Sequence, residues 1–251
     1  MSGGRALVRR MVPLSLRQSF SAARRRWSDA RAGVSFADAR IAQADLSMYT
    51  VLVEIIQPVQ PGTLFENKLI NLACGAARIN LAMLSPGQTC SFWQYVRRPL
   101  ARNGFVEGRN LVNQQLTRQL GGGLCQLSSL MYHLALVAGL EIVERHAHSI
   151  DIYQEQERFT PLGADATVVW GYKDLRLKNS GAGTLVLACH LQQHTLVGRV
   201  YSSMPLPSRA VAFIREPMQP PLVLVRTMVD GQLHTRTEYV QKQGMPLQQR
   251  G

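Results

Sequence analysis

The chain is predicted to adopt an α+β fold, with helices in its N-terminal half and a largely antiparallel sheet in its C-terminal half. Three observations predict this class. Apolar residues recur at helical spacing over 64–84 and 125–139. Short β-branched segments dominate after residue 140, and Asp230-Gly231 separates two of them as a strong hairpin signal. Because helices come first and strands follow, rather than alternating, α+β is favoured over α/β.

Each element follows from its local pattern. Residues 13–31 form a basic segment with helical character, and residues 47–56 are β-branched and apolar, as is typical of a strand. A helix is expected over 64–84, before a turn at Pro86-Gly87, and another over 125–139 with Gly139 as its C-cap. Further strands are expected at 110–116, 140–145, 166–170, 175–178, 184–191, 223–229 and 232–240.

The 251 residues are enough for one large domain or two small ones. The pattern divides them into three parts. Residues 1–46 are expected to form a basic, partly helical arm, and residues 47–180 a core that carries a glycine–cysteine loop. Residues 181–251 are expected to form C-terminal β-hairpins packed on that core.

The charge of the chain is uneven. The net charge is +12, and residues 1–40 contain nine arginines against Asp29 and Asp38. Such an arm either stays solvated or contacts an anionic surface, so peripheral contact with an anionic membrane is one expectation. Nucleic acid is not an expected partner, because neither an aromatic stacking series nor a nucleic-acid motif accompanies the arginines.

Neither a signal peptide nor a membrane span is expected. Arginine and serine interrupt residues 1–27 throughout, whereas a secretory signal needs an apolar run of roughly 7–15 residues. The longest apolar segment, 134–143, is shorter than the roughly 18 residues of a membrane span. A cytoplasmic location is therefore expected, with membrane-peripheral contact through the arm. No pattern predicts a cofactor or an oligomeric state.

The feature most informative about function is a glycine-rich loop that leads into a helix. The run Gly121-Gly122-Gly123-Leu124-Cys125-Gln126 places a thiol in the first helical turn, where free N–H groups and the helix dipole stabilise an anion. Such a position lowers the pKa of a thiol. Cys125 also lies on the helix side of Ser128, Ser129 and Tyr132 rather than on the apolar stripe, which favours a nucleophile over a buried structural thiol.

The glycines predict a ligand-binding role beside this thiol. Gly121, Gly122 and Gly123 permit close approach of the backbone to a ligand, and N–H groups near Gln126 are candidates for an oxyanion hole. Ser128, on the same helix side, is a further candidate ligand-binding residue. The simpler alternative is a tight turn that enters a helix.

Two histidines follow the helix, at His146 and His148. If the strand over 140–145 continues, both rings point to one face, and either is a candidate general base for Cys125. Asp165 is the preferred candidate to orient that base, with Asp151 as the alternative.

The residues that flank the histidines are candidate ligand-binding residues as well. They are Glu144, Arg145 and Ser149. For Glu144 and Arg145, a local ion pair is the favoured interpretation.

A zinc site is the alternative interpretation of the histidines. His146 and His148, with Cys125 or an aspartate, would supply three ligands, the number found in catalytic zinc sites.

The four cysteines form no CxxC pair and no metal-finger spacing. Cys74 and Cys189 are expected in the core, and the role of Cys90 is open.

Together these motifs resemble those of the VanW family. The resemblance covers roughly residues 60–180 and rests on a set of specific segments. One departure is Asn113-Gln114, which stands where members of the family often have Asn-Gly. The matching segments are Asn67-Lys68 with Asn71, Ser85-Pro86-Gly87-Gln88 with Ser91-Phe92, residues 121–128, residues 144–149, Pro161-Leu162-Gly163, Asp165-Ala166-Thr167, and Asp174-Leu175 with Asn179.

The resemblance implies a link to cell-wall antibiotic (vancomycin) resistance but no settled catalytic residues. It makes a peptidoglycan precursor or a related peptide the expected substrate. A weaker similarity to transglutaminase-like and papain-like cysteine enzymes implies cooperation of a helix-start thiol, a strand histidine and a later polar residue.

The sequence thus predicts cysteine-dependent acyl transfer or amide hydrolysis. Cys125 is the expected nucleophile, His148 or His146 the base, and Asp165 the orienting group. The alternative is a non-catalytic module whose glycine loop binds a cell-wall precursor or a partner protein through backbone donors.

Overall fold

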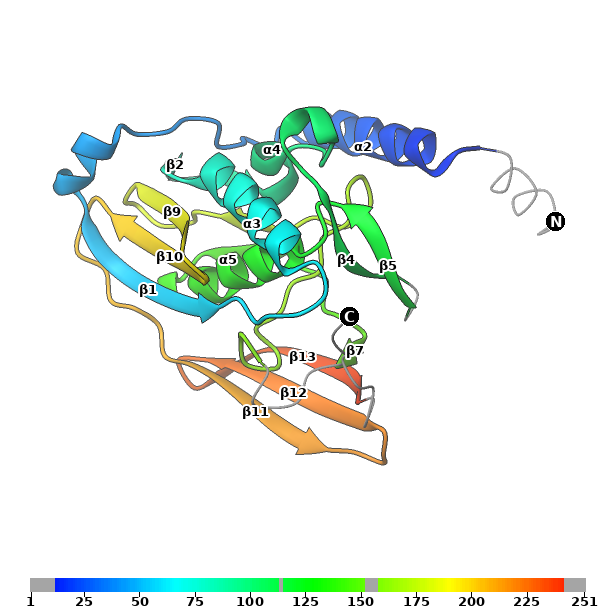
Figure 1. The fold of residues 1–251 in the computed structure, drawn as a ribbon. Helices are drawn as coiled ribbons and strands as arrows, with labels where there is room; N and C mark the ends of the chain where they lie inside the picture. The colour runs from blue at the N-terminus through cyan, green and yellow to red at the C-terminus, as the bar shows by residue number, and fades with distance from the viewer. Residues whose placement is uncertain (1–11, 113–114, 152–157, 242–251) are drawn as a thin grey trace.

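The structure is a computed structural model that describes residues 12–112, 115–151 and 158–241. It confirms the predicted α+β class. The long helices end by residue 138, mostly in the N-terminal half, and antiparallel strands dominate the C-terminal half (Figure 1). Within the described residues, no helix is both long and apolar enough to cross a membrane.

A four-stranded antiparallel sheet covered by two helices forms the main body. The strand order is β1-β10-β9-β2, with β1 at Thr50–Pro58, β10 at Thr195–Ser202, β9 at Leu185–Gln192 and β2 at Ala82–Leu84. Helices α3 (Phe65–Ile79) and α5 (Leu124–Ala138) pack on this sheet (Figure 1). The sheet and the two helices bury their apolar sides against each other. The resulting core includes Leu72, Ile79, Leu127, Leu130, Leu134, Leu187 and Val200.

Helix α3 is shorter than predicted. The sequence pattern extends to residue 84, but the helix ends at Ile79 and Leu81 adopts a positive φ of 62°. Residues Ala82–Leu84 instead form β2, which pairs with β9. The prediction was wrong because a buried strand and a buried helix turn both present apolar residues, and only the pairing partner distinguishes them.

Helix α5 (Leu124–Ala138) matches the predicted 125–139 to within one residue at each end, and it has the predicted C-cap, since Gly139 adopts φ of 74°. The expectation of a polar side away from the core is wrong. Ser128, Ser129 and Tyr132 are almost fully buried, because the chain around residue 166 packs on that side of the helix.

A three-stranded sheet and a hairpin flank the main body. The sheet has the order β3-β8-β6, with β3 at Thr89–Ser91, β8 at Arg176–Lys178 and β6 at Glu141–Glu144, and the five-residue helix α4 (Phe92–Val96) follows β3. The hairpin joins β4 (Glu107–Val112) to β5 (Gln115–Leu120) and leads directly into α5. A short 3₁₀ turn, η2 (Ala101–Asn103), precedes it.

The strand predicted at 166–170 does not form. The segment makes one isolated bridge, from Val169 to Lys173, and otherwise runs as an irregular connection. Its backbone groups bond to α5 side chains and to the chain near His146 instead of to a neighbouring strand.

The C-terminal residues build a second four-stranded sheet, which lies below the main body in Figure 1. Its order is β11-β12-β13-β7, with β11 at Val211–Pro217, β12 at Leu222–Val229, β13 at Gln232–Gln241 and β7 at Ile150–Asp151. The predicted hairpin turn is confirmed, since Asp230 and Gly231 adopt positive φ of 50° and 77°. This sheet has a small core of its own, formed by Leu162, Val223, Val225 and Tyr239.

Helix α2 (Leu14–Arg31) confirms the basic helix predicted at 13–31 and lies on the side of the molecule opposite to the second sheet (Figure 1). Ion pairs anchor it to the body. Arg176 binds Asp29 through two hydrogen bonds of 2.7 and 2.8 Å, and Arg25 pairs with Glu144. A 3₁₀ turn, η1 (Gln43–Met48), leads on to β1.

Candidate functional site

The candidate site forms where α5 begins. Gly123, the N-cap residue, has φ of 97°, a left-handed conformation that favours glycine. This turn places Cys125 in the first turn of α5, where its half-buried thiol lies 4.0 Å from the carbonyl oxygen of Val168. The N–H of Gln126 donates to the Gly123 carbonyl at 3.0 Å, so this predicted oxyanion donor is already occupied.

The glycine loop packs closely against the protein itself. A Cβ at Gly122 would lie 2.2 Å from the carbonyl carbon of Gly108 on β4, and a Cβ at Gly121 would lie 2.7 Å from Pro99. At Gly123, the neighbour is the side chain of Lys68, whose Cγ would be 2.8 Å from a Cβ. The sequence predicted that a ligand would approach these glycines closely. At Gly122, strand β4 of the same chain occupies that position instead.

A buried asparagine fixes this contact. The Nδ2 atom of Asn71 on α3 donates to the carbonyl oxygens of Gly122 at 2.9 Å and Val106 at 3.1 Å. Its Oδ1 atom accepts from the N–H of Val106 at 3.0 Å. Asn71 is fully buried, so these bonds form away from water, where an unpaired amide is costly. The loop therefore holds the start of α5 in a fixed position.

Two serines attach the segment that carries Asp165 to α5. Ser128 Oγ donates to the Ala166 carbonyl at 2.7 Å, and Ser129 Oγ accepts from the Ala166 N–H at 3.0 Å. Ser129 Oγ also donates to the Cys125 carbonyl at 2.6 Å. Ser128, predicted to bind a ligand, is fully buried and acts in this attachment.

The structure brings Cys125, His148 and Asp165 together. Nδ1 of His148 lies 2.8 Å from Oδ2 of Asp165, and the backbone N–H of His148 donates to the same oxygen at 2.7 Å. The Cys125 thiol lies near the His148 imidazole, which lowers the pKa of the thiol. The His148 side chain is 29% exposed, so a substrate can reach it.

Besides His148, a guanidinium and a phenol contact the Asp165 carboxylate. Arg145 donates from Nε to the Asp165 carbonyl at 2.8 Å and pairs with Oδ1 at 3.1 Å. The hydroxyl of Tyr239, on β13, donates to Oδ1 as well. The Arg145 guanidinium also binds Thr237 at 2.9 Å and lies 4.8 Å from the centre of the Tyr132 ring. Asp165 is thereby held between α5 and the second sheet.

These contacts set the protonation states. Burial raises the pKa of Cys125, but the hydrogen bond and charge of His148 outweigh it, so the net pKa lies below its usual value. Burial lowers the pKa of His148, but its interactions with Asp165, which accepts a hydrogen bond from the imidazole, and with Cys125 outweigh it and raise the pKa to about 10. Burial likewise raises the pKa of Asp165, whereas His148 and Arg145 bring it well below its usual range. All three directions favour a thiolate beside an imidazolium.

His146 points elsewhere. Its Nε2 atom lies 2.9 Å from Oε1 of Glu144. The strand ends at Glu144, so the condition under which both histidines would share one face is not met. The predicted local pair of Glu144 with Arg145 is wrong. Glu144 pairs with Arg25 and Arg176, since β6 directs it toward α2 while Arg145 turns toward Asp165.

The other predicted site residues lie outside this group. Gln126 is buried, and its Nε2 atom donates to the Pro58 carbonyl at 3.0 Å. Ser149 is exposed, and its carbonyl accepts from the Val240 N–H at 3.1 Å. Asp151, the alternative orienting residue, pairs with Arg158.

The other three cysteines lie away from the candidate site. Cys189 is fully buried as predicted, and burial raises its pKa to about 12. Cys90 is also fully buried, and burial raises its pKa far above the usual value. Cys74 is half-buried and bonds to the Asn103 carbonyl at 3.3 Å. No group of three or more His, Cys, Asp or Glu side chains in the described ranges is placed to hold a metal ion.

Sequence reasoning missed three contributors to the site. Tyr239 and Thr237 reach it from a strand more than 70 residues beyond Asp165, and no local pattern marks them. Lys68 covers Gly123, and its ammonium lies 5.8 Å from the centre of the Phe159 ring. Burial and the nearby charge of Arg109 lower the pKa of Lys68 to about 8. A lysine in a first helical turn is usually a surface residue, so only the packing reveals it.

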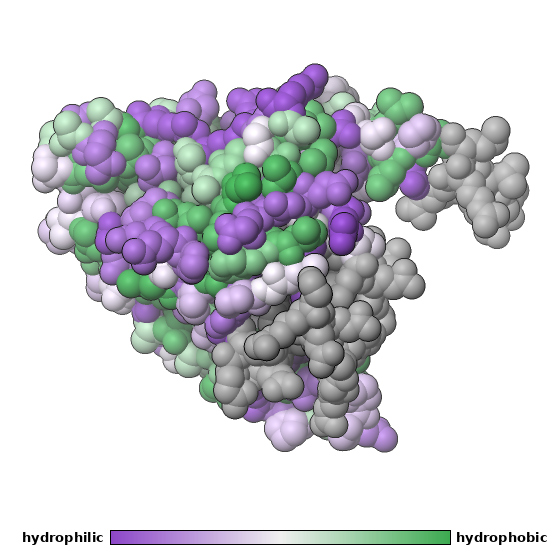
Figure 2. Space-filling model, viewed as in Figure 1, coloured by the Kyte–Doolittle hydropathy of each residue, from purple (hydrophilic) through white to green (hydrophobic). Residues whose placement is uncertain are grey.

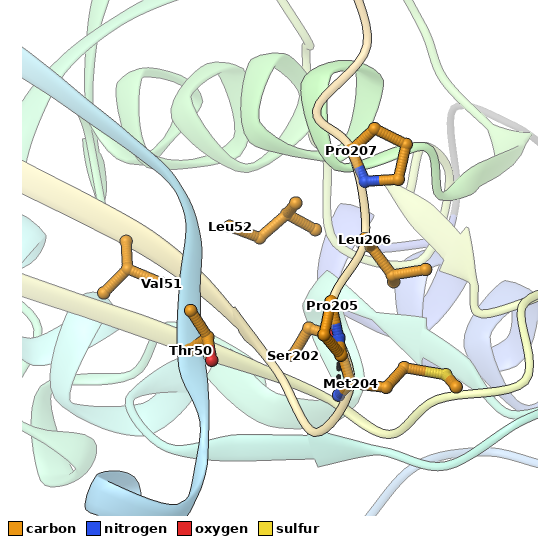
Figure 3. Close-up of a pocket in the computed structure, with 8 residues that line it drawn as sticks. All are labelled: Thr50, Val51, Leu52, Ser202, Met204, Pro205, Leu206 and Pro207. Atoms are coloured by element: carbon orange, nitrogen blue, oxygen red, sulfur yellow. Dashed lines mark hydrogen bonds between the residues drawn. The ribbon is translucent and has the colours of Figure 1, made fainter.

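An apolar cavity of about 290 Å³ lies elsewhere, between the start of β1, the end of β10 and the chain that follows (Figure 3). None of its lining residues belongs to the cysteine site, and none carries an ionisable side chain. They are Thr50, Val51, Leu52, Ser202, Met204, Pro205, Leu206 and Pro207. The cavity therefore offers apolar contact but no acid–base chemistry.

Comparison with known proteins identifies the family of the chain. A family model described as "VanW like protein" matches residues 67–201. The vancomycin B-type resistance protein VanW of Enterococcus faecalis is 32% identical over 137 residues, which are 55% of this chain and 50% of that protein. The uncharacterized protein YoaR of Bacillus subtilis is 29% identical over 151 residues, 60% of this chain and 48% of that protein.

The chain spans about half the length of the curated relatives it matches. No solved structure matches it. The region that the family model matches contains Cys125, His148, Asp165 and the glycine loop, and it makes up more than half of the sequence. The chain therefore belongs to the VanW family.

Proposed function

We propose that this protein is a cysteine-dependent enzyme that transfers or hydrolyses the acyl group of an amide in a peptidoglycan-related peptide. One observation carries the proposal. The His148 imidazole hydrogen-bonds to the Asp165 carboxylate and lies near the Cys125 thiol, whose pKa it lowers. A nucleophile, a base and a group that orients the base are the parts that covalent acyl transfer requires.

The protonation states support a nucleophile that is ready before the substrate arrives. The lowered pKa of Cys125 and the raised pKa of His148 favour a thiolate–imidazolium pair at neutral pH. Asp165 occupies Nδ1 of the imidazole, which leaves Nε2 to exchange a proton with the reacting groups. Arg145 keeps Asp165 ionised, so this orientation persists throughout the reaction.

The reaction follows from this geometry. The Cys125 thiolate attacks the carbonyl carbon of the amide, and the His148 imidazolium gives its proton to the nitrogen as the C–N bond breaks. The product is a thioester and a free amine. Water, or an acceptor amine in a transfer reaction, then attacks the thioester carbon and gives a proton to His148, which restores the thiolate and the imidazolium.

The N–H of Cys125 is our candidate for the oxyanion donor. It donates to no carbonyl in the described part of the chain, whereas the Gln126 N–H is occupied by Gly123. It also lies in the first turn of α5, where the helix dipole favours negative charge.

Two observations support a peptide substrate that carries a carboxylate. The enterococcal relative is named for vancomycin resistance, which connects that protein with the bacterial cell wall. In this chain, Lys68 lies against the glycine loop and forms no ion pair with a carboxylate among the described residues. We infer that it receives a carboxylate of the peptide.

The test is to trap the acyl-enzyme. The purified chain is incubated with a peptidoglycan pentapeptide and, separately, with simple peptide amides, and intact mass spectrometry then follows the protein. We expect a mass increase on Cys125 that hydroxylamine removes, and no increase in Cys125→Ala. Alkylation of Cys125 is expected to show an apparent pKa below the free-thiol value of about 8.5, which His148→Ala restores.

Two outcomes would contradict the enzyme proposal. One is a Cys125 that alkylates no faster than Cys74 at neutral pH. The other is a folded Cys125→Ser variant that binds the pentapeptide as tightly as the wild type while the wild type neither cleaves nor acylates. The second result would instead support the non-catalytic binding module.

A further inference from the structure

Helix α2 turns its polar side toward the body of the protein and its apolar side outward, the opposite of an ordinary surface helix. The residues that face the body of the protein are polar or small, at spacings of three and four, and they include Gln18, Ser21, Ala22, Arg25 and Asp29. Not one residue of α2 is fully buried. A helix that packs on a globular core normally turns its apolar side inward.

Polar contacts hold this inner face in place. Ser21 Oγ donates to the Gly171 carbonyl at 2.6 Å, and Arg25 pairs with Glu144. Asp29 receives the two hydrogen bonds of Arg176. The orientation of α2 is therefore fixed by directional bonds, and rotation of its apolar residues into the body would break all of them.

The outer face of α2, formed by Leu16, Phe20, Ala23 and Trp27, is apolar and points to solvent. Phe20 is 75% exposed and Trp27 is 65% exposed, the largest values among the exposed large hydrophobic residues of the described chain apart from Met48. The three large residues lie four and seven positions apart, so they share one side of the helix. Figure 2 shows hydrophobic atoms exposed at the end of α2 near the N-terminal residues.

Exposed arginines flank the outer face on both sides. Arg24 and Arg31 each follow an aromatic residue by four positions, and the Arg31 guanidinium lies 5.6 Å from the centre of the Trp27 ring. Arg26 lies on the other side. Aromatic residues bordered by arginine are typical of a helix that lies in the interface of an anionic bilayer.

We propose that the outer face of α2 binds the surface of a bilayer that contains anionic phospholipid. The aromatic side chains enter the boundary between headgroups and acyl chains, and the flanking arginines bind phosphate groups. The charge favours lipid over a second copy of this chain, because two such faces would bring like charges together. The proposal is independent of the reaction at Cys125.

The test uses the full chain and sedimentation with vesicles. Vesicles of phosphatidylcholine with phosphatidylglycerol are compared with vesicles of phosphatidylcholine alone. We expect binding to the anionic vesicles that weakens as salt rises. The variant Phe20→Ser with Trp27→Ser should bind at least about tenfold more weakly, and Arg24→Gln or Arg26→Gln about fivefold more weakly each.

A matched control and a depth measurement complete the test. Leu233→Ser removes a 46% exposed apolar residue on β13 and should leave vesicle binding unchanged. Brominated lipid should quench the fluorescence of the wild type and spare Trp27→Phe, since Trp93 is buried and Trp170 is half-buried.

The proposal fails if the wild type does not sediment with anionic vesicles at low salt, or if the double serine variant binds as well as the wild type. Concentration-dependent dimerisation that Trp27→Ser abolishes, without vesicle binding, would assign the face to a second copy and would also overturn the proposal. The alkylation profile of Cys125 should be the same in all these variants, so a failure here leaves the proposed reaction untouched.

Discussion

At the scale of single residues, Asp165 connects the candidate site to the rest of the molecule. One carboxylate oxygen accepts from the backbone and the ring of His148, and the other binds Arg145 and Tyr239. Its side chain is 10% exposed, so the negative charge is stable only because these partners replace water. Asp165 therefore both orients the imidazole and ties three segments together.

This dual role gives a prediction for Asp165→Asn. The amide keeps the shape but removes the charge that stabilises the imidazolium, so the pKa of the Cys125 thiol should rise toward the free value of about 8.5. The measurement is the pH profile of Cys125 alkylation by mass spectrometry. Asp230→Asn, at an exposed hairpin turn, serves as the control and should keep the wild-type profile. An unchanged profile in Asp165→Asn would show that the carboxylate is only structural.

The sequence identified Cys125, His148 and Asp165 as residues but not as a group. It left His146 and His148 equivalent, because an extended chain would place both rings on one face. The structure distinguishes them, since the strand ends at Glu144 and the chain then turns. That turn depends on Arg145, whose partners Thr237 and Tyr239 lie far along the chain, and no local pattern contains this information.

At the scale of elements, the glycine loop and β4 act as one unit that positions α5. Gly122 and Gly108 pack backbone against backbone, and Asn71 bonds to both sides of the contact. The sequence showed that these glycines permit close approach, but it could not show what approaches. The partner is a strand of the same chain.

This packing gives a prediction for Gly122→Ala. The new Cβ would lie 2.2 Å from the Gly108 carbonyl carbon, so β4 or the loop must move. We expect a loss of about 2 kcal/mol in the free energy of unfolding, together with slower alkylation of Cys125 because the start of α5 shifts. Urea denaturation and the alkylation rate at neutral pH provide the measurements.

Gly62→Ala is the matched control for this prediction. A Cβ at Gly62 meets no heavy atom within 4 Å, and its φ lies outside the left-handed region. Its stability should stay within about 0.5 kcal/mol of the wild type. If Gly122→Ala were equally mild, the loop would be more adaptable than its close backbone contact indicates.

Among the elements, those with strong local signals were predicted correctly, whereas the end of α3 and the segment 166–170 were not. Helix α5 and the β12–β13 hairpin have periodic apolar residues and special turn residues, and both have the expected limits. Strand β2 was predicted as the end of α3, and the segment 166–170 was predicted as a strand. In both cases the outcome depends on which distant partner supplies hydrogen bonds.

At the scale of the whole molecule, the candidate site lies between the main body and the second sheet. Arg145 spans this junction, because it contacts Asp165 in the connecting segment, Tyr132 on α5, and both Thr237 and Tyr239 on β13. Folding of the second sheet onto the main body and assembly of the site are therefore linked.

The same charges give the whole protein a pH-dependent stability. Asp165 has a lowered pKa in the folded state, so its contribution is present above the unfolded value of about 4 and is lost as pH falls below it. His148 has a raised pKa, so its contribution is complete below the unfolded value of about 6.5 and is lost as pH rises toward about 10. Both contributions are present in full between about pH 4 and 6.5.

We therefore predict that the stability difference between the wild type and Asp165→Asn is largest in this range. Breaking a buried pair costs about 3 kcal/mol there, and the difference should shrink toward pH 3 and, in part, toward pH 10. Urea denaturation at a series of pH values measures it. A difference that stays constant from pH 3 to pH 10 would contradict the assigned charge states.

The sequence by itself determined the α+β class, the long helices, the terminal hairpin, the family resemblance and the helix-start thiol. These depend on local periodicity, turn chemistry and short motifs, which neighbouring residues carry. The tertiary structure decided which histidine meets the thiol, what the glycines contact and which way α2 faces. Each of these depends on hydrogen bonds and ion pairs between residues far apart in the chain, whose geometry forms only when the chain folds.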